Sequence, residues 1–174
     1  MNNSEQPYKR SIWNIDKRYS IDKDSLSTDM LKKVGMVQSI ESAKKRTPPI
    51  PFADIVKIIN TVENLPAPSN INVEEFITCL KSIDCWGADI KTSIFILSVL
   101  KNGLYPPLDW RIAKAARMKN IVDDREEKIL NGKSKRKIAE IYVKKLLNGW
   151  ERELQKVKDP KKLDNQWGKL ATGI

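Results

Sequence analysis

The sequence contains no histidine and only two cysteines, Cys79 and Cys85. The lack of histidine excludes catalysis by a histidine general base. Two thiols are too few for a structural zinc site or a four-cysteine iron–sulfur cluster held by this chain, so we expect no metal and no cofactor. Nothing in the sequence indicates secretion, and both cysteines are therefore interpreted as small core residues in a reducing compartment.

Apolar runs of membrane-spanning length are also missing, and the first residues contain no apolar segment typical of a signal peptide. We therefore expect a cytoplasmic monomer without a membrane partner. Glycine is scarce, with 7 in 174 residues, and no segment alternates apolar and polar residues as strands do. A hydrophobic content of 40% is sufficient for a core, so the sequence predicts a compact all-α domain, with two small lobes as an alternative.

Positive charge is concentrated in the second part of the chain. Residues 1–109 carry 14 Lys and Arg against 13 Asp and Glu, whereas residues 110–174 carry 18 against 9. This asymmetry favours a polyanionic partner, and nucleic acid is the commonest one. An anionic membrane surface and a merely solubilising charge are the competing interpretations.

Helices are predicted from the spacing of apolar residues and from capping and breaking residues. Residues 1–24 are interpreted as an N-terminal arm and residues 25–174 as the helical domain. Asn72 and Glu75 have the spacing of a capping box, and Trp150 and Trp167 are assigned to the core. The predicted helices cover residues 25–45, 52–65 and 72–83, a segment from Lys91, a segment after Asp109, residues 124–130, an amphipathic segment capped by Ser134 that extends through Trp150 and Leu154, and a segment from Pro160.

The most specific pattern lies between residues 86 and 118. Gly87-Ala88-Asp89-Ile90-Lys91-Thr92-Ser93 is followed by an apolar helix, and the Pro106-Pro107 turn then ends at Asp109, 18 residues after Lys91. This order resembles the helix-hairpin-helix DNA glycosylases, in which a glycine-rich hairpin, a Lys-Thr-Ala-like helix start and a Gly- and Pro-rich turn precede an aspartate at a similar spacing. Leu163-Asp164-Asn165-Gln166-Trp167 is similar to an element of some short members that lack the iron–sulfur loop.

The resemblance covers residues 72–118 best, and within them two positions differ from the family pattern. Asp89 stands where the family has the second hairpin glycine, and Trp86 stands where the family usually has proline. A carboxylate at Asp89 competes with a phosphate for the backbone N–H groups of the hairpin.

The resemblance implies an enzyme that hydrolyses the N-glycosidic bond of a damaged or modified base flipped out of duplex DNA, located with the nucleoid. It assigns Asp109 to stabilising positive charge on the sugar and activating the attacking nucleophile. It places Lys91 where bifunctional members keep a Schiff-base lysine, which would add lyase activity at abasic sites. From residue type alone, Asp109 is also predicted to be the N-cap of the helix that follows, and the two roles are compatible.

Contacts with DNA are predicted for the hairpin, for aromatic residues near Asp109 and for the basic residues after it. Gly87 belongs to the hairpin that holds a phosphate in the family, and Trp110, Trp86 and Tyr105 are candidates to stack on bases, with Trp110 the best placed. Phosphate contacts are predicted for Arg111, Lys114, Arg117, Lys119, Lys133, Lys135, Arg136 and Lys137.

Two other functions are compatible with the same residues. The altered hairpin favours a non-catalytic helix-hairpin-helix DNA-binding module, whereas the retained Lys91–Asp109 spacing favours the enzyme. A helical protein-interaction domain with a solubilising charge is the third interpretation. No motif names the base that is removed, or distinguishes repair from defence against modified foreign DNA.

Overall fold

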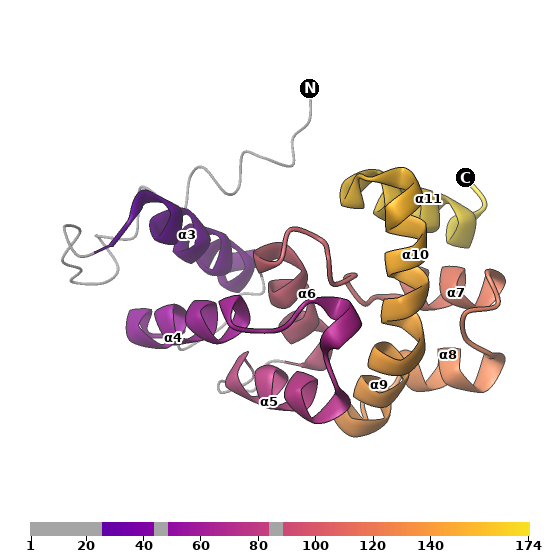
Figure 1. Cartoon of the computed structure of the whole chain (residues 1–174), viewed down its shortest axis with the longest axis horizontal. Helices are drawn as coiled ribbons and strands as arrows, with labels where there is room; N and C mark the ends of the chain where they lie inside the picture. The colour runs from indigo at the N-terminus through magenta and orange to yellow at the C-terminus, as the bar shows by residue number, and fades with distance from the viewer. Residues whose placement is uncertain (1–25, 44–48, 84–88) are drawn as a thin grey trace. The chain divides into compact units, whose positions relative to one another are not determined.

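The computed structural model describes residues 26–43, 49–83 and 89–174 (Figure 1). All regular structure in these ranges is helical, which confirms the predicted all-α class. The chain divides into two units, Met1–Glu63 and Asn64–Ile174. None of the described helices combines the length and the apolar composition needed to cross a bilayer.

The first unit contains α3 (Thr28–Ala43) and α4 (Phe52–Glu63), which pack against each other. Their apolar residues recur at helical spacing, and the buried set is Val34, Val37, Ile40, Ile55, Ile58, Ile59 and Val62. At the end of α3, the buried carboxylate of Glu41 accepts a hydrogen bond from the backbone N of Ile50 at 2.9 Å. This bond ties the start of the segment leading into α4 to the last turn of α3.

The second unit is built from helices that follow the predicted order. They are η2 (Pro68–Asn70), α5 (Val73–Ile83), α6 (Ile90–Leu100), α7 (Trp110–Met118), α8 (Asp124–Leu130), α9 (Lys135–Ile141), η3 (Tyr142–Leu146), α10 (Leu147–Val157) and α11 (Pro160–Thr172). Asn72 and Glu75 form the predicted reciprocal cap, with bonds of 3.1 and 2.9 Å. Ser134 precedes α9 as predicted, but the prediction that it caps this helix is wrong in one respect, because its side chain makes no capping hydrogen bond.

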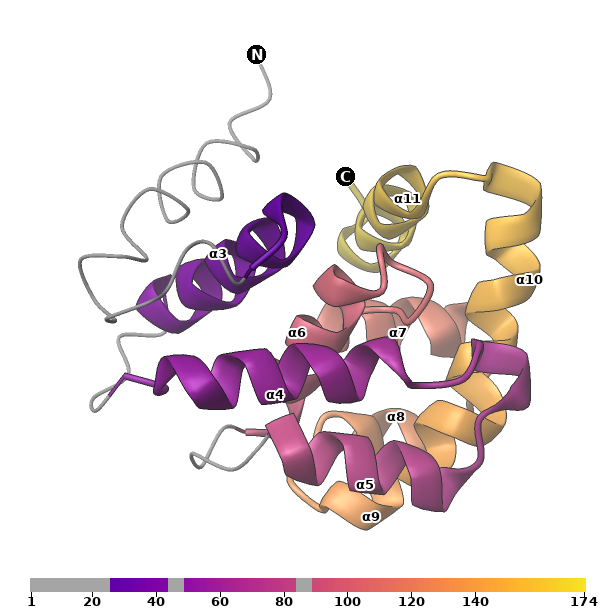
Figure 2. The ribbon, with the colours of Figure 1, turned by 60° about the vertical axis from the view of Figure 1, so that its left-hand side comes forward.

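The segment from Lys135 to Val157 is one continuous helical rod, as expected, but its middle turn, η3, is a π-helix (Figures 1 and 2). The buried residues Ile138, Tyr142, Leu146 and Trp150 recur every four positions. In a regular α-helix a spacing of four drifts by about 40° per step. The wider π turn, with its i→i+5 hydrogen bonds, takes up part of this drift and keeps the four side chains on one face.

Aromatic rings fill the core of the second unit. The ring of Phe76 lies parallel to that of Tyr142, with centroids 4.8 Å apart, and Trp150 meets Trp167 edge to face at 5.2 Å. Trp150 and Trp167 are fully buried, which confirms their assignment to the core. Because Trp167 belongs to α11 and Trp150 to α10, this pair packs the last helix against the rod.

Candidate active site around Asp109

The turn from α6 to α7 is held by side chains from distant parts of the second unit. The Trp150 indole Nε1 donates to the carbonyl oxygen of Gly103 at 3.0 Å, and the Tyr142 hydroxyl donates to that of Pro106 at 2.6 Å. The Tyr105 hydroxyl, within the turn, donates to the carbonyl of Pro66 at 2.7 Å. The first two bonds satisfy carbonyls of a segment that two prolines keep out of any helix, and the third anchors the Tyr105 side chain, so the turn is rigid.

Tyr105 therefore has a structural position and is not a stacking residue. Its side chain is fully buried, and burial raises the pKa of its phenol. The prediction that Tyr105 stacks on a base is wrong because its ring packs inside the core, parallel to Phe76 with centroids 6.5 Å apart. Trp110, the favoured candidate, is 54% exposed.

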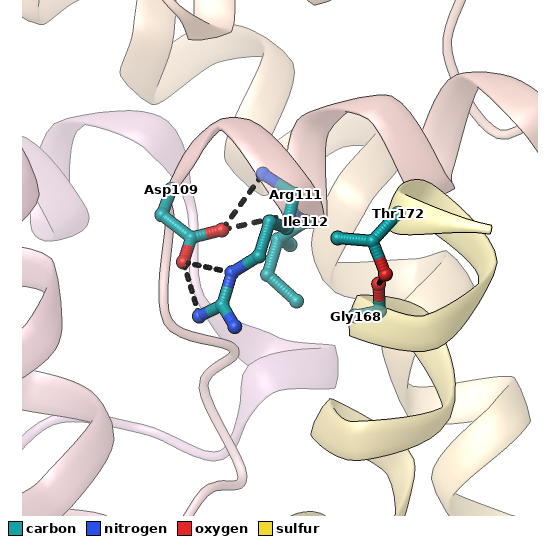
Figure 3. A network of polar contacts seen from close by, with 5 residues as sticks. All are labelled: Asp109, Arg111, Ile112, Gly168 and Thr172. Atoms are coloured by element: carbon teal, nitrogen blue, oxygen red, sulfur yellow. Dashed lines mark hydrogen bonds and ion pairs between the residues drawn. The ribbon is translucent and has the colours of Figure 1, made fainter. Parts of the chain in front are cut away.

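Asp109 follows this turn as the N-cap residue of α7 (Figure 3). Its Oδ1 accepts hydrogen bonds from the backbone N of Arg111 at 2.9 Å and of Ile112 at 3.0 Å. This confirms the predicted cap. An aspartate N-cap also places negative charge at the positive end of the helix dipole, which stabilises α7.

The second oxygen of Asp109 pairs with the Arg111 side chain. Oδ2 accepts from Nε at 3.0 Å and from Nη2 at 2.6 Å, a fork geometry in which the two donors meet one oxygen (Figure 3). The side chains are 38% and 45% exposed, so solvent reaches both groups. A ligand approaching Oδ2 has to displace the guanidinium of Arg111.

Helix α11 packs against α7 (Figure 3), and the carboxylate of its Asp164 interacts through its charge with Arg111 and Asp109. Gly168 faces Arg111 closely enough that a Cβ added there would stand 3.8 Å from Nη1. Asp164 lies one turn before Gly168 on α11. Burial raises the pKa of Asp164, the charge of Arg111 opposes this shift, and the charge of Asp109 adds to it. The sequence pattern gave Asp164 no role of its own, although Leu163 and Trp167 around it are buried as their helical spacing indicates.

Lys91 is the second residue of α6 and has a different polar partner. Its Nζ donates to the carbonyl of Asn131 at the end of α8, at 3.4 Å. Lys91 and Asp109 both lie in the part of the chain that the structure describes, and no hydrogen bond or ion pair joins them. The hairpin residues Trp86 and Gly87 lie outside the described residues.

Asp89, at the altered hairpin position, is the N-cap of α6. Its carboxylate accepts a hydrogen bond from the backbone N of Thr92 at 2.7 Å. The sequence predicted that the Asp89 carboxylate competes with a phosphate for backbone N–H groups. In the structure, the Thr92 N–H that a phosphate would use at this helix N-terminus is already bonded to Asp89.

Several of the predicted phosphate-binding residues form ion pairs. Arg117 pairs with Glu127, Lys119 Nζ lies 3.0 Å from the carboxylate of Glu153, and Arg136 Nη2 lies 2.7 Å from that of Glu74. Lys114 lies in α7 and Lys137 in α9, and among the residues described these two form no ion pair. Lys133, in the turn between α8 and α9, and Lys135, the first residue of α9, are exposed.

Among the described residues, no group of three or more Cys, Asp or Glu side chains is placed to hold a metal ion. No known family model, no curated protein and no solved structure matches this chain. What the site can do therefore has to be argued from its own geometry, which presents one fixed, solvent-accessible carboxylate beside an exposed indole and a guanidinium.

Proposed function

We propose that this protein is a DNA glycosylase that hydrolyses the bond between a damaged or modified base and its deoxyribose. The observation that carries the proposal is the carboxylate of Asp109, fixed by backbone N–H groups at the end of a rigid turn and still open to solvent. Breaking an N-glycosidic bond develops positive charge on the sugar, and a pre-positioned carboxylate stabilises that charge without reorganising.

In this mechanism the two oxygens of Asp109 have different tasks. Oδ1 stays bound to α7 and fixes the orientation, while Oδ2 faces the sugar and accepts a proton from the attacking water. Arg111 has to leave Oδ2 first, and a strand phosphate is the natural alternative partner for a guanidinium. Trp110 supplies an exposed ring for stacking on a base that has left the duplex.

The protein would act as a monomer on duplex DNA in the cytoplasm. Its excess of basic residues after position 109 supports DNA as the partner, and binding of this kind weakens steeply with salt. Lys114 and Lys137 are candidates for phosphate contacts without loss of an internal ion pair.

A second candidate is a non-catalytic DNA-binding module. Two observations favour it, namely the use of Asp89 as an internal cap of α6 and the closure of Arg111 over Asp109. Under this alternative Asp109 only caps α7, and the basic surface binds DNA without chemistry.

Duplexes that carry a series of damaged and modified bases, incubated with the protein and followed by mass detection of free base, test the proposal. Asp109→Asn should abolish base release and keep DNA affinity, because asparagine is also a good N-cap residue. Asp159→Asn is the matched control, since Asp159 caps α11 through two backbone N–H groups in the same way. Equal base release by the parent and Asp109→Asn would refute the enzyme and leave the binding module.

Lyase activity is tested separately with Lys91→Ala. If Lys91 forms a Schiff base, this variant should lose strand cleavage at abasic sites and keep base release. Unchanged cleavage by Lys91→Ala would remove Lys91 from the mechanism without affecting the role of Asp109.

A further inference from the structure

A recess of about 500 Å³ lies at the far end of α7 from Asp109. The turn after α7, with Asn120 and Ile121, forms one wall, and the polar side of η3 and α10 forms the other. Helix α7 has nine residues, so its axis separates the recess from Asp109 by about 14 Å. The recess is therefore a different place from the candidate active site.

At the base of the turn after α7, Ile121 packs directly against Gly149 of the rod. A Cβ at this position would lie 2.6 Å from Cδ1 of Ile121 and under 3 Å from two more of its carbons. Glycine thus allows the turn after α7 to approach the rod closely. Asn120 makes the turn in the left-handed region, with φ of 56°, a conformation that asparagine tolerates better than most residues.

The rod presents cations at helical spacing on the wall opposite this turn. Lys144, Asn148 and Arg152 follow one another at intervals of four residues, so they share one face of the rod. Lys145 also lines the recess. The amide Nδ2 of Asn148 donates to the carbonyl of Lys144 at 3.2 Å, which fixes that side chain against the rod.

The charge of the lining is positive and only partly balanced. Three cations stand against one carboxylate, that of Glu151, and Lys145 Nζ is paired with Glu126 at 2.5 Å. Lys144 and Arg152 are exposed and form no ion pair within the described ranges. Two cations without partners around a concave surface attract an anion, and a guanidinium fork beside an ammonium suits a tetrahedral oxyanion.

We propose that this recess binds a phosphate group, with Arg152 and Lys144 as its main contacts and Asn120 as a further donor. A volume of about 500 Å³ exceeds what a single phosphate fills, so the bound phosphate can be part of a larger molecule. Its source is a free nucleotide or a nucleotide of a strand. The proposal does not depend on Asp109 or on glycosylase activity.

Calorimetric titration of the full chain at low salt tests the proposal, with inorganic phosphate, a nucleoside diphosphate and a short single-stranded oligonucleotide as probes. The double variant Lys144→Ala/Arg152→Ala should weaken binding of at least one of these probes about tenfold or more, since it loses two charge-assisted contacts. Lys158→Ala/Lys161→Ala removes two other exposed cations and is the matched control. Glu151→Gln should tighten binding, because it removes the one acidic group of the lining.

The probes separate the two sources. Tight binding of the diphosphate that the double variant abolishes assigns a free nucleotide. Tight binding of the oligonucleotide alone, with a salt dependence that the double variant reduces by about one to two counterions, assigns a strand. If the double variant weakens no probe more than the control does, or if Glu151→Gln weakens binding, the recess is not a phosphate site. None of these measurements uses base release, so failure here leaves the proposed function untouched.

Discussion

Replacing Gly103 with alanine tests the rigidity of the turn that leads to Asp109. Gly103 has φ of +75°, and a Cβ there would stand 2.4 Å from Cβ of Pro160, the first residue of α11. Ordinary carbon–carbon contacts are about 3.5–4.0 Å, so α11 or the turn has to move by roughly 1 Å. The carbonyl of Gly103 accepts the hydrogen bond from Trp150, so such a movement also disturbs this bond.

The expected loss in the free energy of unfolding of Gly103→Ala has three contributions. The left-handed conformation costs about 1–2 kcal/mol for alanine, overpacking costs about 1–3 kcal/mol, and the lower entropy of the unfolded chain offsets about 0.4–1 kcal/mol. The free energy of unfolding should fall by about 2–4 kcal/mol. For a urea slope of about 2 kcal/mol per molar, the midpoint should move down by about 1–2 M.

Gly173→Ala is the matched control because Gly173 has nearly the same φ, +73°, and nothing within 4 Å of an added Cβ. It isolates the conformational contribution, and we expect a loss of about 1 kcal/mol or less. Urea denaturation of the three proteins under one set of conditions gives the comparison. If the two variants agree within about 0.5 kcal/mol, the contact between Gly103 and Pro160 does not constrain the turn.

Three further predictions concern the hydrogen bond from Tyr142 to the turn and two residues of α11. Tyr142→Phe leaves the buried carbonyl of Pro106 without its donor and should lower the free energy of unfolding by about 1–3 kcal/mol in urea denaturation. Gly168→Ala should raise it by about 0.5–1 kcal/mol, since an added Cβ meets only ordinary contact with Arg111 in a helix interior, and lower stability would contradict the packing of α11 on α7. The raised pKa of Asp164 means that the folded state binds its proton more tightly, so stability falls as pH rises from 3.8 through the folded pKa. Asp164→Asn should remove this part of the pH dependence in denaturation at several pH values and be at least as stable as the parent at pH 7.

Local features of the fold were predictable because their causes are local. The reciprocal cap of Asn72 and Glu75 and the helix at residues 124–130 follow from neighbouring residues, and both are found as predicted. Asp109 as the cap of α7 follows from the same reasoning.

The hydrogen bonds from Tyr142 and Trp150 to the turn were not predictable, because their partners are far apart in the sequence. Tyr142 lies 36 residues from Pro106, and Trp150 lies 47 residues from Gly103. Their apolar spacing indicated burial, but spacing carries no information about which carbonyl a phenol or an indole meets. The burial of Tyr105 could not be predicted either. Its position near Asp109 in the sequence favoured a stacking role, but its side chain is buried in the core.

The separation of these partners has a consequence for how the protein is made. A ribosome synthesises the loop bearing Asp109 before it synthesises Tyr142 and Trp150, which immobilise that loop. In a nascent chain that ends before the rod, the loop bearing Asp109 therefore lacks the hydrogen bonds that fix it. Any chemistry that depends on the orientation of Asp109 begins only after the C-terminal third of the chain has folded against the loop.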